Sequence, residues 1–264
     1  MKAAFDDTAA VYDDQFTNSR IGRLQRNQVW NYLERLYNDQ FPAKVLELNC
    51  GTGEDALFFA RHGSSVTATD VSVKMLEVAL AKTTAAGLGD KITTRQLDFW
   101  RIREFQPDQK YNLVFSNFGG LNCSNEDNIR LLCRKAARIL EPGGRLIFVV
   151  MPRFCAWETT YYLSRFQFTR AFRRRKKHAQ AAQIGNDQVD IWYHDAGTIA
   201  KLANEFETVQ VKPIGITIPP SYFSEGFLDR KIFLDSLGFA EEKLNKFSLL
   251  ARLSDHYLID LKLR

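Results

Sequence analysis

Val45-Leu-Glu-Leu-Asn-Cys-Gly51-Thr-Gly53-Glu-Asp-Ala56 is an apolar strand pattern that runs into a glycine turn and then into a helical pattern. Gly51 and Gly53 allow the backbone to turn tightly and to come close to a ligand. The N–H groups at the start of the following helix favour a negatively charged or polar ligand group. The turn therefore predicts a nucleotide-like ligand. Because Gly-x-Gly-x-x-Ala also fits a dinucleotide site, the turn alone does not choose between NAD and another adenosine cofactor.

Polar side chains at the ends of three strands narrow the choice of ligand. Glu47 and Asn49 end the first strand, where a carboxylate would repel a pyrophosphate and suits a cofactor with positive charge. Asp70 ends the second strand, at the position from which a carboxylate can accept hydrogen bonds from both ribose hydroxyls. Asp98 ends the third strand beside Phe99, and an acceptor next to an aromatic ring suits the amino edge and ring face of adenine. These residues are expected at the carboxyl edge of the sheet, where open α/β sheets bind ligands.

Four motifs together resemble the class I S-adenosylmethionine-dependent methyltransferases: ELNCGTGED at 47–55, TATDVSVKML at 67–76, QLDFW at 96–100 and LEPGGRLIFVV at 140–150. The resemblance covers most of the chain. It implies an α/β, doubly wound, Rossmann-like sheet of seven strands in the order 3-2-1-4-5-7-6, with the last strand antiparallel. It also implies S-adenosyl-L-methionine as cofactor and S-adenosyl-L-homocysteine as product.

The resemblance assigns parts of the cofactor to particular residues. Glu47 and the glycine turn would hold the methionine portion, Asp70 the ribose, and Asp98 with Phe99 the adenine, on which Met75 would pack. The full set of expected cofactor residues is Glu47, Asn49, Gly51, Gly53, Asp70, Val71, Met75, Asp98, Phe99 and Asn117.

The pattern of the remaining chain agrees with such a sheet. Short β-branched runs alternate with helical patterns, which is typical of βαβ units. We expect strands at 44–49, 65–69, 92–97, 111–117 and 145–151, followed by two more at 207–220 and 256–263. The last two leave no room for a right-handed crossover and so predict an antiparallel edge. Ser72 and either Ser124 or Asn125 are the expected N-caps of two of the helices.

Residues 1–264 are expected to form a single methyltransferase domain with helical additions. The spacing of apolar residues predicts an N-terminal helix over 20–39, and residues 1–40 are interpreted as a helical lid. The aromatic and basic segment 153–190 has no strand signal and is interpreted as an insertion. Helical insertions at 153–194 and 221–252 are expected to cap the substrate site.

Composition excludes several classes of protein. The 264 residues are 45% hydrophobic and 25% charged, unlike disordered or collagen-like chains, and their number allows a core without disulfides or metals. No metal site is expected. The four cysteines form no C-x-x-C pair, and MKAAFDDTAAVYDD is acidic where a signal peptide would be basic and then apolar, so a cytoplasmic location is expected. No apolar run approaches the roughly 18 residues of a membrane span.

Candidate catalytic residues follow from the chemistry of methyl transfer. A sulfonium methyl is already activated, so in-line displacement mainly requires that the acceptor be held close and in line. An acceptor hydroxyl or acidic carbon also requires a base, and His194 is the first candidate because histidine titrates near neutral pH. Beside Asp195, however, His194 could equally begin a helix. Glu158 and Tyr12 are the other candidates, and FDDTAAVYDDQF at 5–16 resembles a lid segment in which a tyrosine closes over the cofactor.

The expected acceptor is a small, lipophilic or aromatic molecule that is methylated on oxygen, nitrogen or carbon. SNFGGLNC at 116–123 lacks the Pro-Pro-aromatic motif of enzymes that methylate amino groups of adenine or glutamine, so Asn117 and Phe118 are interpreted as cofactor and pocket lining. Trp157 and Tyr161 are expected to line the acceptor pocket. They belong to an aromatic stripe that would share one face of a helix: Phe154, Trp157, Tyr161, Phe168 and Phe172.

Two other classes remain open at this stage. One is an NAD-type Rossmann oxidoreductase. The other is an RNA-binding or RNA-modifying protein that uses the basic run at 165–177, which holds seven Lys or Arg and no acid. The net charge is +5, so the rest of the chain is slightly acidic. A nucleic-acid surface usually gathers Lys and Arg from several elements, so a positive charge confined to one segment argues against it. Such a segment suits weak contact with a membrane or another anionic surface, or a solvated helix face. The sequence does not indicate an oligomeric state.

Overall fold

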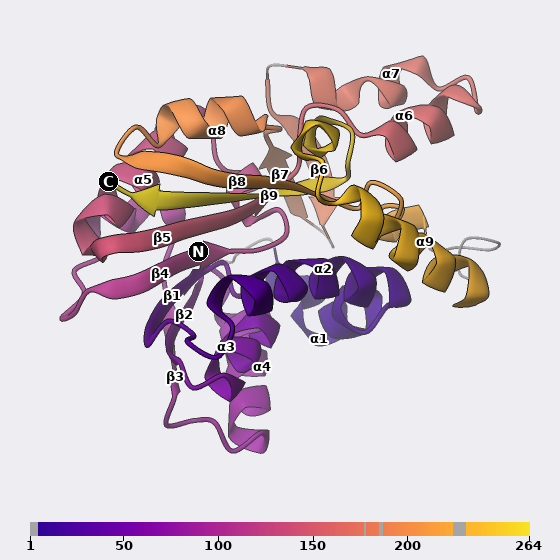
Figure 1. Cartoon of the computed structure of the whole chain (residues 1–264). Coiled ribbons are helices and arrows are strands. Elements are labelled where there is room, and N and C mark those ends of the chain that lie inside the picture. Colours follow the sequence, from indigo (N-terminus) through magenta and orange to yellow (C-terminus); the bar gives the residue numbers. More distant parts are fainter. Residues whose placement is uncertain (1–4, 177, 185–186, 224–230) are drawn as a thin grey trace.

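The computed structural model has a seven-stranded sheet with helices on both faces (Figure 1). It describes residues 5–176, 178–184, 187–223 and 231–264. The strand order is β3-β2-β1-β4-β5-β9-β8. The strands are β1 Lys44–Leu48, β2 Ser65–Asp70, β3 Ile92–Gln96, β4 Tyr111–Ser116, β5 Leu140–Val150, β8 Phe206–Ile214 and β9 His256–Leu263. β1 to β5 are parallel and β9 is antiparallel to both β5 and β8, so the predicted order 3-2-1-4-5-7-6 is confirmed.

Helices connect the parallel strands, as the alternating pattern predicts. They are α3 Glu54–Arg61, α4 Val73–Ala85, α5 Glu126–Ile139 and, before β8, α8 Ala196–Leu202, with short 3-10 helices η3 Phe99–Glu104 and η4 Gly120–Cys123. The Ser72 hydroxyl caps α4 by accepting from the Met75 N–H at 3.0 Å. Asn125, rather than Ser124, caps α5 by accepting from the Asn128 N–H at 3.0 Å.

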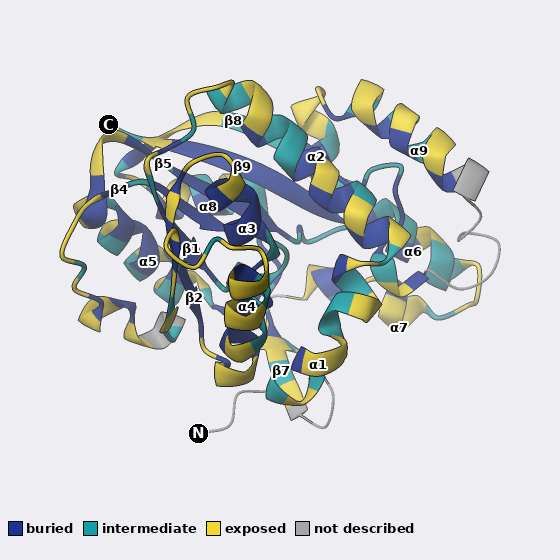
Figure 2. Cartoon of the chain, turned by 90° about the horizontal axis from the view of Figure 1, so that it is seen from below, coloured by how far each residue is buried: buried dark blue, intermediate teal, exposed yellow. Residues whose placement is uncertain are grey.

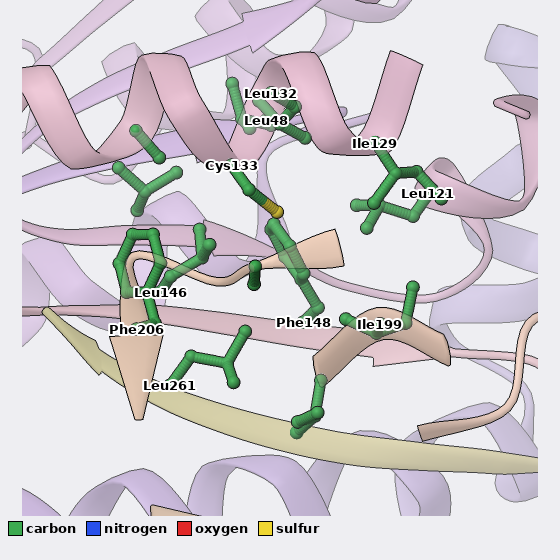
Figure 3. Packing of buried hydrophobic residues seen from close by; sticks show 14 of the residues in the cluster. Leu48, Leu121, Ile129, Leu132, Cys133, Leu146, Phe148, Ile199, Phe206 and Leu261 are labelled. Atoms are coloured by element: carbon green, nitrogen blue, oxygen red, sulfur yellow. The ribbon is translucent and has the colours of Figure 1, made fainter. Parts of the chain in front are cut away.

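The sheet has a hydrophobic core on each face, because side chains of successive strand residues point to opposite sides. Leu46 and Leu48 belong to the core beneath α5 and α8, where Figure 3 shows Cys133 of α5 pointing toward Phe148 of β5. Val45 belongs to the core on the other face, beneath α3 and the N-terminal helix α2 (Arg20–Tyr37). Figure 2 shows the same layering, with buried residues concentrated in the strands and on the inner sides of the helices.

The N-terminal segment is helical, as expected, but consists of several pieces. Before α2 come the 3-10 helix η1 (Asp6–Thr8), α1 (Ala9–Tyr12) and the π-helical turn η2 (Asp13–Thr17). Ser19 separates them from α2 and caps that helix by accepting from the Gly22 N–H at 3.0 Å.

The interpretation of 153–190 as a segment without strands is wrong. It holds α6 (Ala156–Leu163), α7 (Phe168–Ala171), the 3-10 helix η5 (Arg173–Arg175) and an antiparallel hairpin of β6 (Gln180–Ile184) and β7 (Asp187–Ile191). The hairpin escaped sequence analysis because QAAQI and DQVDI contain few of the β-branched and aromatic residues that mark strands. Figure 1 places these elements together beyond one end of the sheet.

The expected single helix carrying the aromatic stripe is also absent from this described part of the chain. α6 ends at Leu163, and Phe166 adopts a left-handed conformation with φ of 57°, which interrupts the helix before α7. As a result Phe168 and Phe172 are 59% and 41% exposed instead of sharing a buried face.

The C-terminal third departs from expectation in smaller ways. The strand expected at 207–220 ends at Ile214. In the expected helical stretch 221–252 the described elements are η6 (Ser221–Phe223), α9 (Lys231–Leu244) and η8 (Ser248–Arg252), and residues 224–230 lie outside the described residues. Among the helices that the structure describes, none has the length and apolar character needed to cross a bilayer.

Candidate active site

A cavity of about 980 Å³ lies at the carboxyl ends of the parallel strands. Its walls bring together the glycine turn, the ends of β2 and β3, the N-terminal segment, the hairpin β6–β7 and the start of β9. Its lining residues include Tyr12, Phe16, Asn49, Gly51, Asp70, Val71, Met75, Gln96, Asp98, Phe118, Cys123, Met151, Val189, Ile191, Tyr222, Asp255 and His256. Most come from segments that are far apart in the sequence.

The glycine turn has the geometry that its sequence predicts. Gly51 and Gly53 have φ values of 53° and 79°, in the left-handed region that favours glycine. A Cβ on Gly53 would lie 2.9 Å from the Cβ of Ala79, so only glycine lets α4 pack this closely against the turn. Asn49 also has positive φ, 55°, and its side chain lies against Gly120. The turn is therefore held between α4, which contains Ala79, and η4, which begins at Gly120.

Asp70 organises the turn as well as lining the cavity. Its Oδ2 accepts a hydrogen bond from the Gly51 N–H at 2.9 Å, and its Oδ1 accepts from the Ser72 N–H at 2.8 Å. Burial raises the pKa of this carboxyl, although these backbone N–H groups oppose the rise. A carboxylate has about four lone-pair positions, so acceptor capacity remains for ligand hydroxyls.

The residues expected at the adenine end are mostly in place. Val71, Met75 and Asp98 line the cavity beside Gln96. Met75 is buried and lies in the first turn of α4. Phe99 starts η3, but its side chain lies outside the described part of the structure, so its predicted role stays a prediction.

Glu47 and Asn117 lie near the cavity without being among the residues that line it. Glu47 is 1% exposed, and its Oε2 has no hydrogen-bond partner among the described residues. Burial, with the charge of Asp55 nearby, raises its pKa well above the usual range. The Asn117 amide donates to Asp55 at 3.1 Å and its Oδ1 accepts from the Phe118 N–H at 3.0 Å, so Asn117 shapes the loop after β4.

The N-terminal segment covers the glycine turn. Tyr12 lines the cavity, and its ring is the nearest group to a Cβ built on Gly51, at 3.9 Å. Asp13 fastens this segment: it accepts from the Thr52 hydroxyl at 2.6 Å and pairs with Lys82 of α4 at 2.9 Å. Burial raises the pKa of the Tyr12 phenol to about 12, so at neutral pH this residue is a neutral hydrogen-bonding group.

His194, the first candidate base, does not line the cavity. His194 is 1% exposed. Its Nε2 lies 2.9 Å from the Ser124 carbonyl oxygen and must donate a hydrogen bond to it, since a carbonyl oxygen can only accept. Burial lowers the pKa of His194, which favours the neutral ring. The side chain therefore ties the segment before α8 to the segment before α5, which corresponds to the structural alternative rather than to catalysis.

Glu158 is likewise engaged away from the cavity. Its carboxylate pairs with Arg173 at 2.6 Å and with Arg174 at 2.9 Å and accepts from the Tyr222 hydroxyl. Although burial opposes the shift, the two arginines and Tyr222 lower the pKa of this carboxyl. It is a buried counter-ion, not an available base.

Of the three predicted pocket residues, one lines the cavity and two do not. Phe118 lines the cavity, with its ring edge-on to Phe16. Trp157 and Tyr161 do not: the Trp157 indole donates to the Thr217 carbonyl at 3.1 Å, and Tyr161 packs on Phe223. The expectation failed because α6, which carries both residues, packs against the segment 217–223 instead of over the cavity.

The basic run at 165–177 does not form one exposed basic face. Arg174 is buried at 3% exposure, Arg173 pairs with Glu158, and Arg165 lies over the Tyr161 ring at 3.8 Å. Lys177, the last residue of the run, lies outside the described residues. Part of the basic run is therefore buried or paired with carboxylates inside the protein.

Sequence analysis missed Asp255 and His256, which both line the cavity. They precede and begin β9, in the stretch Ser-Asp-His-Tyr at 254–257, about two hundred residues after the glycine turn. The sequence feature that could have indicated them is an Asp-His pair at the start of the last predicted strand. Its proximity to the cavity depends on β9 lying beside β5, and the sequence alone does not reveal that contact.

Comparisons with known proteins agree with this arrangement. Residues 45–144 match the methyltransferase domain family. The demethylmenaquinone methyltransferase of Tropheryma whipplei (strain Twist) is 30% identical over 154 residues, which are 57% of this chain and 60% of that protein. The match thus spans less than two thirds of the relative's length.

Two solved structures share the fold over nearly the whole chain. The CcbJ methyltransferase from Streptomyces caelestis has a TM-score of 0.64 at 16% identity, over 99% of this chain and 98% of that one. The DhpI complex with S-adenosylhomocysteine has a TM-score of 0.60 at 17% identity, over 98% and 93%.

The sheet order, the glycine turn and the acids at the strand ends define a Rossmann-like methyltransferase domain. The match of residues 45–144 to the methyltransferase domain family, the named relatives and the shared fold support a class I S-adenosylmethionine-dependent methyltransferase. The residues present fit this cofactor, since the cavity offers the spare acceptor capacity of Asp70 and a buried apolar surface at Met75. The orphaned Glu47 oxygen lies in the strand that leads into the turn, near the expected site of the positively charged portion.

Proposed function

We propose that this chain transfers the methyl group of S-adenosylmethionine to a small, largely apolar acceptor. The proposal rests on the size of the cavity and on the residues that line it. Its volume of about 980 Å³ is at the upper end of the ~300–1,000 Å³ typical of ligand pockets. Such a volume suits two molecules side by side better than one.

The two parts of the cavity differ in chemistry. The part at the glycine turn carries Asp70 and Asp98, the expected partners of ribose and adenine. We assign the acceptor to the rest of the cavity, where six lining residues are apolar or aromatic: Phe16, Phe118, Cys123, Met151, Val189 and Ile191. An apolar acceptor would lose water readily on entering this second part.

The chain's own residues would act mainly by binding and exclusion of water. S-adenosylmethionine supplies an activated sulfonium methyl, so holding the acceptor close and in line accounts for much of the acceleration. The N-terminal segment, fastened by Asp13 to Thr52 and Lys82, would cover the cofactor. The hairpin β6–β7 and residue Tyr222 would form the cap over the acceptor, in place of the helical insertion expected from the sequence.

The names of related proteins indicate a range of acceptors. The relative from Tropheryma whipplei is named for demethylmenaquinone, and one structural neighbour is titled an N-methyltransferase. The apolar lining of the cavity favours a largely apolar ring system over a small, polar amine. We therefore propose a hydroxylated aromatic acceptor.

The test is the release of S-adenosylhomocysteine in the presence of defined acceptors. We expect turnover with 1,4-dihydroxynaphthalene and none above background with glycine. Val189→Trp should raise the KM for the aromatic acceptor at least tenfold while leaving the affinity for S-adenosylhomocysteine unchanged, because Val189 lies in the acceptor part.

The matched control is Val209→Trp, which adds the same bulk at an exposed position of β8 that does not line this cavity. Preference for glycine, or equal kinetics in the two tryptophan variants, would contradict the proposed acceptor site.

A further inference from the structure

We propose that His256 is the catalytic base that removes a proton from the acceptor, and that Asp255 and Arg174 position it. This inference rests on the proposed function, because it assigns the proton transfer at that same site. It names a residue pair that no motif of the methyltransferase domain at 45–144 contains.

His256 is placed where a base is needed. It begins β9, lines the cavity and is 9% exposed. Its ring meets the Phe118 ring edge-on, with centroids 5.4 Å apart. Phe118 belongs to the acceptor part of the cavity, so the imidazole lies beside the space proposed for the acceptor.

One ring nitrogen of His256 faces the Asp255 carboxylate. The Nδ1 of His256 lies 3.1 Å from the Oδ2 of Asp255, although the angle falls short of a hydrogen bond in this conformation. Catalytic hydrogen bonds are commonly misaligned before the substrates bind. A carboxylate at this distance favours a proton on Nδ1, which leaves the Nε2 lone pair as the base.

Asp255 is held firmly as an anion. Arg174 donates to its Oδ1 at 2.8 Å and to its backbone carbonyl at 2.8 Å, and the Gln25 amide donates to its Oδ2 at 3.1 Å. Burial alone would raise the pKa of Asp255, but His256 and Arg174 hold it well below its usual value. The carboxylate therefore stays charged and can stabilise an imidazolium.

Other charged and titratable groups surround this pair. Arg26 of α2 lies over the Phe118 ring at 5.4 Å, and Tyr222 of η6 lies against Arg174, whose guanidinium is 3.4 Å from the Tyr222 hydroxyl. Arg174 pairs with Asp255 and Glu158, and Arg26 pairs with Asp55, so His256 does not face an unpaired cation among these groups.

The other histidines of the chain lack this placement. His194 donates to a carbonyl outside the cavity, His62 stacks on Phe41 at the end of α3, and His178 is exposed. Of the four histidines in the sequence, His256 is the one among the cavity-lining residues of the described chain.

The acceptor oxygen forms a bond to the methyl carbon while the carbon–sulfur bond breaks and its electron pair stays on sulfur. The Nε2 of His256 takes the hydroxyl proton of the acceptor, and Asp255 stabilises the resulting imidazolium. The ring then releases this proton to water, so each turnover yields methylated acceptor, S-adenosylhomocysteine and one proton.

The first arm of the test observes the imidazole directly. In ¹⁵N NMR of the protein with bound S-adenosylhomocysteine, His256→Gln identifies the His256 signals by their loss. We expect the neutral ring to carry its proton on Nδ1. A proton on Nε2 would overturn the assignment, because that nitrogen could not accept another.

The second arm measures turnover of 1,4-dihydroxynaphthalene. His256→Gln should lower kcat by ~10² to 10⁴ and remove the acid limb of the pH–rate profile, with unchanged affinity for S-adenosylhomocysteine. His62→Gln is the matched control and should behave as the wild type. In His256→Ala, added imidazole should restore part of the lost rate, which a variant damaged only in structure would not show.

The outcomes separate the two proposals. A wild type that binds no S-adenosylhomocysteine would overturn the proposed function together with the base. Normal binding with undiminished turnover in His256→Gln, or with no rescue of His256→Ala by imidazole, would overturn the base alone.

Discussion

At the scale of single residues, Asp70 shows how one side chain serves both fold and ligand. Its two oxygens accept the N–H groups of Gly51 and Ser72, which fixes the turn, and its remaining lone pairs are available to a ribose. The sequence predicted the second role, from the position of an acid at a strand end. It could not distinguish that role from turn stabilisation, and the geometry is compatible with both at once.

We expect Asp70→Asn to weaken binding of S-adenosylhomocysteine at least about tenfold, because hydrogen bonds to a charged group contribute about 1.5–3 kcal/mol each. Since burial raises the pKa of Asp70, binding should also weaken on acidification at a higher pH than for an exposed aspartate. Calorimetric titration measures both effects. Asp90→Asn, at an exposed position, is the control, and equal affinities in the two variants would contradict the ribose assignment.

For His194, we expect an effect on stability and not on catalysis. Its pKa is lowered by burial, so the unfolded chain takes up a proton below about pH 6.5 that the folded chain resists. Stability therefore falls as the pH drops through this range, and His194→Gln should reduce that dependence while keeping kcat. Denaturant unfolding at pH 5.5 and 8 checks the first part; a large loss of kcat with normal stability would return His194 to the active site.

At the scale of elements, the segment after β5 departs furthest from the sequence prediction. Its helices are short, its hairpin carries few strand-forming residues, and Arg174 of η5 turns inward to Glu158 and Asp255. A basic run usually indicates a solvated face, since buried arginines are rare. Nothing local in the sequence indicates that Glu158, sixteen positions earlier, and Asp255, eighty-one positions later, supply the counter-charges.

Arg174→Met should destabilise the protein by about 3–5 kcal/mol, because it leaves buried carboxylates with fewer partners. Lys176→Met, two residues away and exposed, should change stability by less than about 0.5 kcal/mol. The lowered pKa values of Glu158 and Asp255 mean that their contribution is present above about pH 4.5 and is lost as the pH falls further. Chemical unfolding at pH 4 and 7 measures both effects, and similar losses in the two variants would contradict the account.

At the scale of the whole molecule, the sheet could be predicted because its strands and glycine turn carry strong local signals. The five parallel strands follow apolar runs, and the lack of space for a crossover between the two terminal strands predicted the antiparallel edge. The acceptor part of the cavity could not be predicted in the same way. Phe118, Val189, Tyr222 and His256 meet there only because the sheet brings together segments that are distant in the chain.

The central claim is that the cavity at the carboxyl edge of the sheet binds S-adenosylmethionine and not a dinucleotide. Isothermal titration of the full chain with S-adenosylhomocysteine and, separately, with NAD tests it most directly. We predict saturable, one-to-one binding of S-adenosylhomocysteine and no detectable heat with NAD, because residues 45–144 match the methyltransferase domain family. Binding of NAD with comparable or higher affinity, or no binding of S-adenosylhomocysteine, would contradict the account.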